Sequence, residues 1–196
     1  MGKIIDCITF FDNNYIFDFR YNVLNELVDK FVICESLYDH KNNLKNRNFD
    51  LTEKYKNNSK IKYLLLKEPF PKNNNEWQNQ ASQREFILNN LDFAKDDDFI
   101  FFSDPDEIPN PKILKNFNLK KKYGIFLQNF YVYNLDTFNH YETPWEGTRI
   151  CMKKNLKSIT YLRKKIKKSN LKKPFWKIHI SKDIECFNNG GWHFNN

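Results

Sequence analysis

Three carboxylates fall within four residues near the middle of the chain, in the segment Asp104-Pro105-Asp106-Glu107. They follow the apolar run 99–102, which has the pattern of a strand buried on both faces. In an extended segment alternate side chains share a face, so we expect Asp104 and Asp106 to point the same way. Paired oxygen ligands at the carboxyl end of a buried strand suit Mg²⁺ or Mn²⁺. A strand that runs into a solvated acidic turn is an equal alternative on spacing alone.

Two further charged residues occupy positions where a nucleotide can bind. Glu35 ends the short apolar run 31–34, so it should emerge at the same sheet edge as Asp104 and accept hydrogen bonds from a ribose or a base. A helix cap or a surface carboxylate is nearly as good an interpretation of Glu35. Arg84 lies within a predicted helix, where a guanidinium can grip a diphosphate. For Arg84 the sequence alone favours a surface ion pair.

The segment 190–193 near the C-terminal end places a Gly-Gly pair before an aromatic ring and an imidazole. Because the chain has only 5 Gly, the pair indicates a tight passage of the backbone close to another group. Trp192 can stack on a sugar or a base, and His193 can ligate a metal, although a lone histidine near a chain end is often simply exposed. The loop 145–148 carries Glu146 beside a tryptophan and is a weaker candidate for contact with an acceptor.

The elements that would position these residues alternate as in a parallel α/β sheet. In the first half the periodicity predicts four strands and two helices, with loops at 38–49 and 68–75: strands 4–11, 31–35, 61–66 and 98–103, and helices 15–30 and 76–94. In the second half it predicts strands at 123–135, 148–153 and 175–180, which suggests a mixed sheet joined to the parallel one. We expect one α/β domain over 1–196, with a nucleotide-binding half (1–110) and a mixed-sheet acceptor half (111–196).

Composition places the chain among globular proteins. It has 196 residues, 40% of them hydrophobic and 17% aromatic, which is enough for one well-packed domain. Its 4 scattered cysteines lack CxxC spacing, which argues against a zinc site or a disulfide framework. We find neither a signal peptide nor an apolar run of about 20 residues, the length of a membrane span. We therefore expect a cytoplasmic protein with reduced thiols.

The net charge of +8 is concentrated in one segment. Ten basic residues and no acid lie between Lys153 and Lys173, so the rest of the chain carries 8 − 10 = −2. Ile159, Leu162 and Ile166 share one face of a possible helix within it. We favour a solvated helix face, then peripheral contact with an anionic membrane, then a nucleic-acid patch.

Several motifs in their order resemble glycosyltransferase family 17. The resemblance rests on the following segments: Thr9-Phe10-Phe11, Phe19-Arg20, 24–27, 28–36, Gln83-Arg84, 103–109 and 190–194. It implies a GT-A-like fold, inversion at the sugar, a divalent metal, a nucleotide-sugar donor such as UDP-N-acetylglucosamine, and a glycan acceptor. Members continue beyond the Gly-Trp-His motif, so the resemblance also implies that this chain, which stops at Asn196, is shortened.

The resemblance also suggests roles for individual residues. It implies Mn²⁺ or Mg²⁺ held by Asp104, Asp106 and His193. Residues expected at the donor are Phe10, Glu35, Arg84, Asp104, Arg149 and Trp192. Inversion needs a carboxylate base, for which the candidates are Glu107, Glu142 and Glu146. Two other functions compete: a metal-dependent phosphoryl-transfer enzyme, and a basic nucleic-acid-binding domain.

Overall fold

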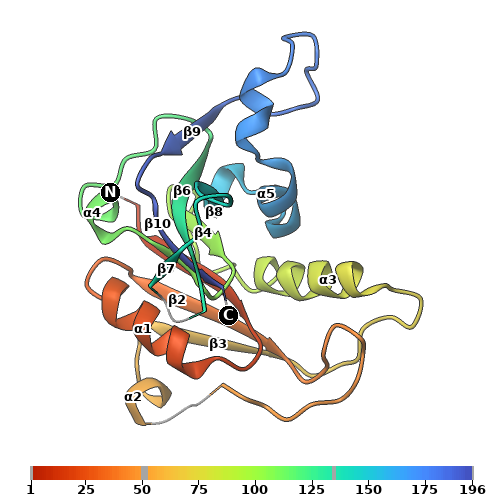
Figure 1. The fold of residues 1–196 in the computed structure, drawn as a ribbon. Coiled ribbons are helices and arrows are strands. Elements are labelled where there is room, and N and C mark those ends of the chain that lie inside the picture. Colours follow the sequence, from red (N-terminus) through yellow and green to blue (C-terminus); the bar gives the residue numbers. More distant parts are fainter. Residues whose placement is uncertain (1, 50–52, 134–135, 196) are drawn as a thin grey trace.

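The computed structural model describes residues 2–49, 53–133 and 136–195 (Figure 1). The strands are β1 (Ile4–Phe10), β2 (Lys30–Ser36), β3 (Ile61–Leu66), β4 (Phe99–Ser103), β5 (Glu107–Pro109), β6 (Tyr123–Val132), β7 (Thr137–Phe138), β8 (Trp145–Met152), β9 (Ile184–Phe187) and β10 (Gly191–Asn195). The helices are α1 (Asn14–Leu24), α2 (Glu53–Lys56), α3 (Glu76–Leu88), α4 (Pro111–Leu114) and α5 (Ile159–Lys165), with 3-10 turns at Lys153–Asn155 and Lys168–Lys172.

These strands form a mixed sheet in the order β3-β2-β1-β4-β8-β6-β10-β5, with β7 and β9 also paired to β6. Strands β3, β2, β1 and β4 run parallel, and β8 is antiparallel to both β4 and β6. Strand β10 is parallel to β6, so the carboxyl ends of β1, β4, β6 and β10 meet at one edge of the sheet. The predicted α/β class, with a parallel-to-mixed sheet flanked by helices, is confirmed.

Side chains that alternate along the strands build one core on each face of the sheet. On one face Ile8, Phe31 and Phe101 pack with Phe17 of α1. On the other, residues such as Cys7, Val32 and Phe102 pack with the apolar sides of α3 and α5. Figure 1 shows α3 and α5 together on one side, with α1 on the other. The shared face predicted for Ile159, Leu162 and Ile166 is confirmed, because all three are fully buried.

Several predicted boundaries are wrong. The first helix ends at Leu24, six residues before its predicted end, because a turn at 25–27 leads into β2. Helix α3 ends at Leu88 instead of residue 94 and leaves Trp77 exposed. Segment 175–180 is not a strand: it forms exposed turns, and β9 supplies the partner of β6 instead. Strand β6 ends at Val132, and the predicted continuation to 134–135 lies outside the described residues.

The Gly-Gly pair lets β10 enter the sheet between β6 and β5. A Cβ built on Gly191, whose φ is +120°, would lie 2.1 Å from the carbonyl oxygen of Ile108. A Cβ on Gly190 would lie 2.6 Å from the backbone nitrogen of Leu127. The tight backbone passage predicted from the sequence is therefore confirmed, and it fixes where the next residues of β10 point.

Candidate active site

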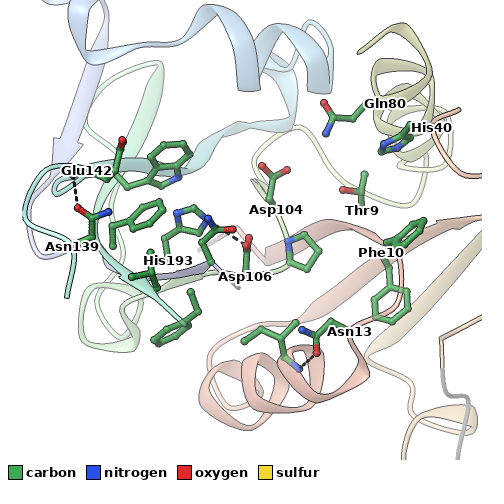
Figure 2. A pocket seen from close by; sticks show the side chains of 18 of the residues that line it. Thr9, Phe10, Asn13, His40, Gln80, Asp104, Asp106, Asn139, Glu142 and His193 are labelled. Carbon is green, nitrogen blue, oxygen red and sulfur yellow. Dashed lines mark hydrogen bonds and ion pairs between the residues drawn. The ribbon is translucent and has the colours of Figure 1, made fainter. Parts of the chain in front are cut away.

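A cavity of about 790 Å³ opens at the edge where the carboxyl ends of β1, β4, β6 and β10 meet. Phe10 lines it at the end of β1 and Asn13 after that strand, Asp104 and Asp106 line it after β4, and His193 lines it on β10. Figure 2 shows His40 and Gln80 toward one end, Asn139 and Glu142 toward the other, and the two aspartates between them. Ligands of open α/β sheets usually bind at this edge, so we take the cavity as the candidate active site.

The two aspartates diverge because the chain turns at residues 105–106. The amide of Glu107 donates to the carbonyl of Asp104 over 3.0 Å, which closes the turn. The Asp106 carboxylate lies 3.3 Å from Nε2 of His193, whereas Asp104 pairs with Arg163 at 2.5 Å and with Arg84 at 3.6 Å. Both aspartates line the cavity, but the extended conformation expected for this segment is wrong, and the two carboxylates have different partners.

A buried arginine of α1 holds this turn in place. Arg20 forms an ion pair with Asp6 of β1 at 2.6 Å, and both side chains are buried. The same guanidinium donates to the carbonyl of Glu107 over 2.5 Å and to the hydroxyl of Ser103 over 3.1 Å. It thus connects β1 with both ends of the acidic segment, a role that the sequence did not reveal.

His193 is held between two aromatic rings. It stacks on Trp145 with ring centroids 4.8 Å apart and meets the edge of Phe130 at 4.5 Å. These rings and the pairing of β10 with β5 and β6 fix the imidazole with Nε2 directed at Asp106 (Figure 2). The cavity therefore presents one carboxylate and one ring nitrogen side by side.

This donor pair fits a divalent cation that also binds phosphate. No group of three or more His, Cys, Asp or Glu side chains is placed to hold a metal within residues 2–49, 53–133 and 136–195. Mg²⁺ and similar ions at phosphate-transferring sites commonly take one or two protein ligands and complete their shells with phosphate and water. Asp106 and His193 match that donor set, whereas the oxygens of Asp104 face two guanidinium groups.

Glu107 lies beneath the cavity and not in it. Its carboxylate is fully buried and accepts hydrogen bonds from Nε1 of Trp145 at 2.7 Å, from Arg163 at 2.6 and 3.0 Å, and from the amide of Asp104 at 3.1 Å. A carboxylate with this many donors has no lone pair directed at a substrate. Glu107, one of the three candidate bases, is therefore not placed to act as a base, and it supports the acidic turn from within.

Arg163 of α5 is a further residue whose role the sequence analysis missed. It bridges Glu107 and Asp104, and although burial lowers the pKa of its guanidinium, these two carboxylates raise it above the ordinary value overall. The signal available was one arginine in a run of lysines, next to the buried Leu162. Arginine is the cation suited to bidentate contact with carboxylates, so it marks an internal ion pair where lysine marks a solvated face.

Arg84 and Arg149 are buried close to these groups, and neither belongs to the lining of the cavity among the described residues. Burial lowers the pKa of Arg84, whose Nε and Nη1 atoms have no hydrogen-bond partner among the described residues. Burial lowers the pKa of Arg149 to about 10, and its guanidinium donates to the carbonyls of Glu146, Gly147 and Ile166. The guanidinium of Arg149 does not line the cavity, because its N–H groups donate to carbonyl groups of the main chain.

Six charged residues therefore form one cluster, called the charge cluster below: Asp104, Glu107, Glu146, Arg84, Arg149 and Arg163. It contains three carboxylates and three guanidinium groups, so its net charge is zero. Asp104 is the member that also reaches the cavity.

Two further residues predicted at the donor also lie outside the lining of the cavity, Glu35 and Trp192. Glu35 is fully buried and accepts from Lys45 at 2.6 Å, the amides of Asn48 at 2.7 Å and Phe49 at 3.0 Å, and the hydroxyl of Tyr63 at 2.7 Å. Its oxygens are thus used inside the protein. Trp192 alternates with His193 along β10 and packs against the core on the opposite face of the sheet.

The other two candidate bases, Glu142 and Glu146, differ in whether their carboxylates already have partners in the protein. Glu142 is exposed and lines the cavity, and its carboxylate makes no ion pair or hydrogen bond within the described part of the chain. Glu146 pairs with Arg149 at 3.3 Å and accepts from the amide of Lys168 at 3.1 Å. Of the three candidates, Glu142 has the carboxylate available to a ligand.

A family model for glycosyltransferase family 17 matches residues 1–182. The chain belongs to this family. It is therefore a glycosyltransferase, which sets aside the phosphoryl-transfer enzyme and the nucleic-acid-binding domain considered from the sequence. No curated protein matches it at a significant level.

Two solved structures are similar to this family 17 chain at a low level. One is a provisionally assigned glucose-1-phosphate thymidylyltransferase from Bacillus anthracis in complex with sucrose, at 11% identity and a TM-score of 0.48, covering 98% of this chain and 88% of that one. The other is a glycosyltransferase involved in glycosylation of the major capsid of PBCV-1, at 13% identity and a TM-score of 0.41, covering 95% and 82%. Scores this low carry no functional argument, so the assignment rests on the family match.

The glycosyltransferase has no helix, over its described residues, with the length and apolar character needed to cross a membrane. The lining of the cavity also includes polar residues that the sequence analysis did not single out: Asn13, His40, Gln80 and Asn139. They come from separate loops and helices, and none carried a local pattern that could have marked it.

Proposed function

We propose that this glycosyltransferase is inverting and metal-dependent, and transfers N-acetylglucosamine from UDP-N-acetylglucosamine to a glycan acceptor. The observation that carries the proposal is the placement of Asp106 and His193 midway along the cavity, between an aromatic end and the free carboxylate of Glu142 (Figure 2). A cavity of about 790 Å³ is in the range that accommodates a nucleotide-sized ligand.

The uridine would occupy the end of the cavity that contains Phe10, Phe11, Asn13 and His40. The ring of Phe11 is 50% exposed there, which leaves a flat apolar surface for stacking on a base. Nδ2 of Asn13 and Nδ1 of His40 would provide polar atoms for the edges of the base and the ribose, because Oδ1 of Asn13 accepts from the amide of Ile16 and Nε2 of His40 pairs with Gln83. In this arrangement Phe10 supports Phe11 and the loop from below, since it is itself buried against Phe49.

The diphosphate would lie beside Asp106 and His193, which would hold Mn²⁺ or Mg²⁺. The ion supplies Lewis-acid stabilisation of the charge on the departing UDP. His193 is kept in place by Trp145 and Phe130, and Asp106 by the turn anchored on Arg20. The neutralisation of Asp104 by Arg84 and Arg163 limits the negative charge that the incoming diphosphate meets.

Glu142 would act as the base. Its carboxylate takes the proton of the acceptor hydroxyl while the hydroxyl oxygen bonds to the anomeric carbon, and the bond to UDP breaks on the opposite face. The proposal places the acceptor at this end of the cavity, where the side chains of Asn139 and Trp145 also line the wall.

The test is a thermal-shift screen of nucleotide sugars with and without Mn²⁺, followed by hydrolysis of the best ligand in the absence of an acceptor. Ligand bound to the native state raises the melting temperature, so the donor is identified without knowledge of the acceptor. We expect UDP-N-acetylglucosamine with Mn²⁺ to give the largest shift. A larger shift with another nucleotide sugar would overturn the donor, and an equal shift in EDTA would overturn the metal.

A further inference from the structure

Residues 171–182, called the basic-aromatic loop below, stand out from the body of the protein beyond α5 (Figure 1). Its large apolar side chains are turned outward: Phe175 is 84% exposed, Trp176 66% and Ile178 91%. The rings of Phe175 and Trp176 contact each other with centroids 5.2 Å apart. Apolar side chains this exposed on one short loop indicate a surface that meets a partner.

The backbone of the basic-aromatic loop is held by turns. The amide of Lys177 donates to the carbonyl of Pro174, and the amide of Ile180 to the carbonyl of Lys177, both over 3.1 Å. At the base of the loop the Lys182 ammonium group donates to the carbonyl of Pro174. These bonds shape the loop into successive turns and not into a strand, and its large apolar side chains are exposed.

Basic groups surround this tip. Within the loop lie Lys172, Lys173, Lys177 and Lys182, and the sequence has no acidic residue from Lys153 to Lys182. The lining of a cavity of about 520 Å³ between the loop and α5 includes four lysines and one histidine beside uncharged residues: Lys164, Lys165, Lys167, Lys173 and His179. The exposed side chains of Phe175, Trp176 and Ile178 thus lie next to a basic cavity. This combination suits a partner with an apolar interior and an anionic outer layer.

We propose that the basic-aromatic loop docks the protein on an anionic lipid membrane. Trp176 and Phe175 would enter the interface between headgroups and acyl chains, which tryptophan prefers, and the lysines would meet lipid phosphates. Nucleic acid attracts the same lysines, but it offers no apolar layer for Ile178 and Leu171. The membrane matches both features. The inference stands independently of the donor and base proposed above.

The experiment is flotation of the protein with vesicles of phosphatidylcholine alone, or of phosphatidylcholine with about a third phosphatidylglycerol. We expect binding to the anionic vesicles only. Lys172/Lys173/Lys177→Gln should weaken it on the order of 100-fold, and Phe175/Trp176→Ser on the order of tenfold. The matched control is Lys56/Lys67/Lys72→Gln, which removes the same charge from exposed lysines at the β3 side of the sheet and should bind as the wild type does.

Depth of insertion gives a second measurement. Acyl-chain-brominated lipid should quench tryptophan fluorescence of the wild type, and Trp176→Phe should remove this quenching while the other three tryptophans remain. Binding by Lys56/Lys67/Lys72→Gln as weak as that of the loop variant would overturn the proposal, because general charge would explain it. So would tight RNA binding indifferent to Phe175/Trp176→Ser. Self-association of the free protein that this substitution abolishes would assign the loop to a second copy instead.

Discussion

The charge cluster lies next to the cavity rim, which is formed by Asp106, His193 and Glu142. The two regions differ in how the charged groups are satisfied. In the cluster, Glu107 is buried and receives hydrogen bonds from Trp145, Arg163 and a backbone amide. On the rim, Asp106 has His193 as its partner, and the carboxylate of Glu142 is free within the described residues. Hydrogen-bond donors of the protein satisfy the buried carboxylate of the cluster, whereas the carboxylates on the rim remain accessible to a ligand.

This comparison separates two kinds of acidic residue that look alike in the sequence. A buried carboxylate needs internal donors, because its desolvation is otherwise too costly, and those donors leave nothing for a substrate. A carboxylate on the rim keeps its solvation and its lone pairs. Asp104 stands between the two, since it lines the cavity but pairs with Arg163 and Arg84.

The largest effect should come from the rim. Asp106→Asn removes the anionic ligand of the proposed ion, so we expect acceptor-free hydrolysis of the donor to fall by on the order of 10³-fold with little change in melting temperature. EDTA should abolish hydrolysis by the wild type, and Mn²⁺ should restore it. The matched control is Asp92→Asn, an exposed aspartate after α3. Wild-type hydrolysis by Asp106→Asn would move the metal site elsewhere.

The second effect concerns the cluster and should appear in stability. Arg163→Gln leaves Glu107 and Asp104 without their shared cation, and we expect a loss of about 3 kcal/mol in the free energy of unfolding, measured with urea. Lys121 forms the comparison, because it and its partner Asp183 are each 55% exposed. Lys121→Gln should change the free energy of unfolding by less than about 0.5 kcal/mol. Equal effects of the two substitutions would contradict the distinction between buried and exposed pairs.

The third effect returns to the rim and separates the base from the metal site. Glu142→Gln removes the proposed proton acceptor, so hydrolysis should drop by on the order of 10²-fold while the donor-induced thermal shift stays as in the wild type. Glu146→Gln is the control, since its carboxylate is tied to Arg149 and to the amide of Lys168. We expect it to retain hydrolysis within about threefold. If Glu146→Gln has the larger effect, the base has been assigned to the wrong glutamate.

Features of the fold that depend on local sequence patterns could be predicted, whereas features that depend on contacts between residues far apart in the chain could not. Strands β1, β2, β3 and β4 were predicted because unbroken apolar runs between helices carry a local signal. Segment 175–180 is also rich in aromatic and β-branched residues, although Lys177 and His179 interrupt it. Strand β9 occupies the position beside β6 instead, and no local pattern records which segment pairs there. Strand β10 was recognised only as a tight passage, since its two neighbours β6 and β5 are distant in the chain.

The site shows the same limit. The acidic motif and the Gly-Trp-His motif indicated which residues to consider, and Asp104, Asp106 and His193 do line one cavity. Their orientations depend on a turn, on Arg20 and on Arg163, all set by contacts between residues far apart in sequence. The sequence analysis predicts the correct sheet edge for Glu35 and Glu107, but it wrongly expects their carboxylates to be accessible to a ligand. A sequence indicates where a strand ends, but not which groups contact the last side chain of that strand.

The smallest effect concerns Glu35, whose carboxylate is buried as that of Glu107 is in the charge cluster. Tyr63→Phe removes one of the four groups that donate to this carboxylate, so we expect a loss of about 1 kcal/mol in the free energy of unfolding. The KM for the donor should not change, because Glu35 faces the protein interior. Tyr38→Phe, which alters a neighbouring tyrosine with no hydrogen bond to Glu35, is the control. A several-fold rise in KM with unchanged stability would instead return Glu35 to the nucleotide site.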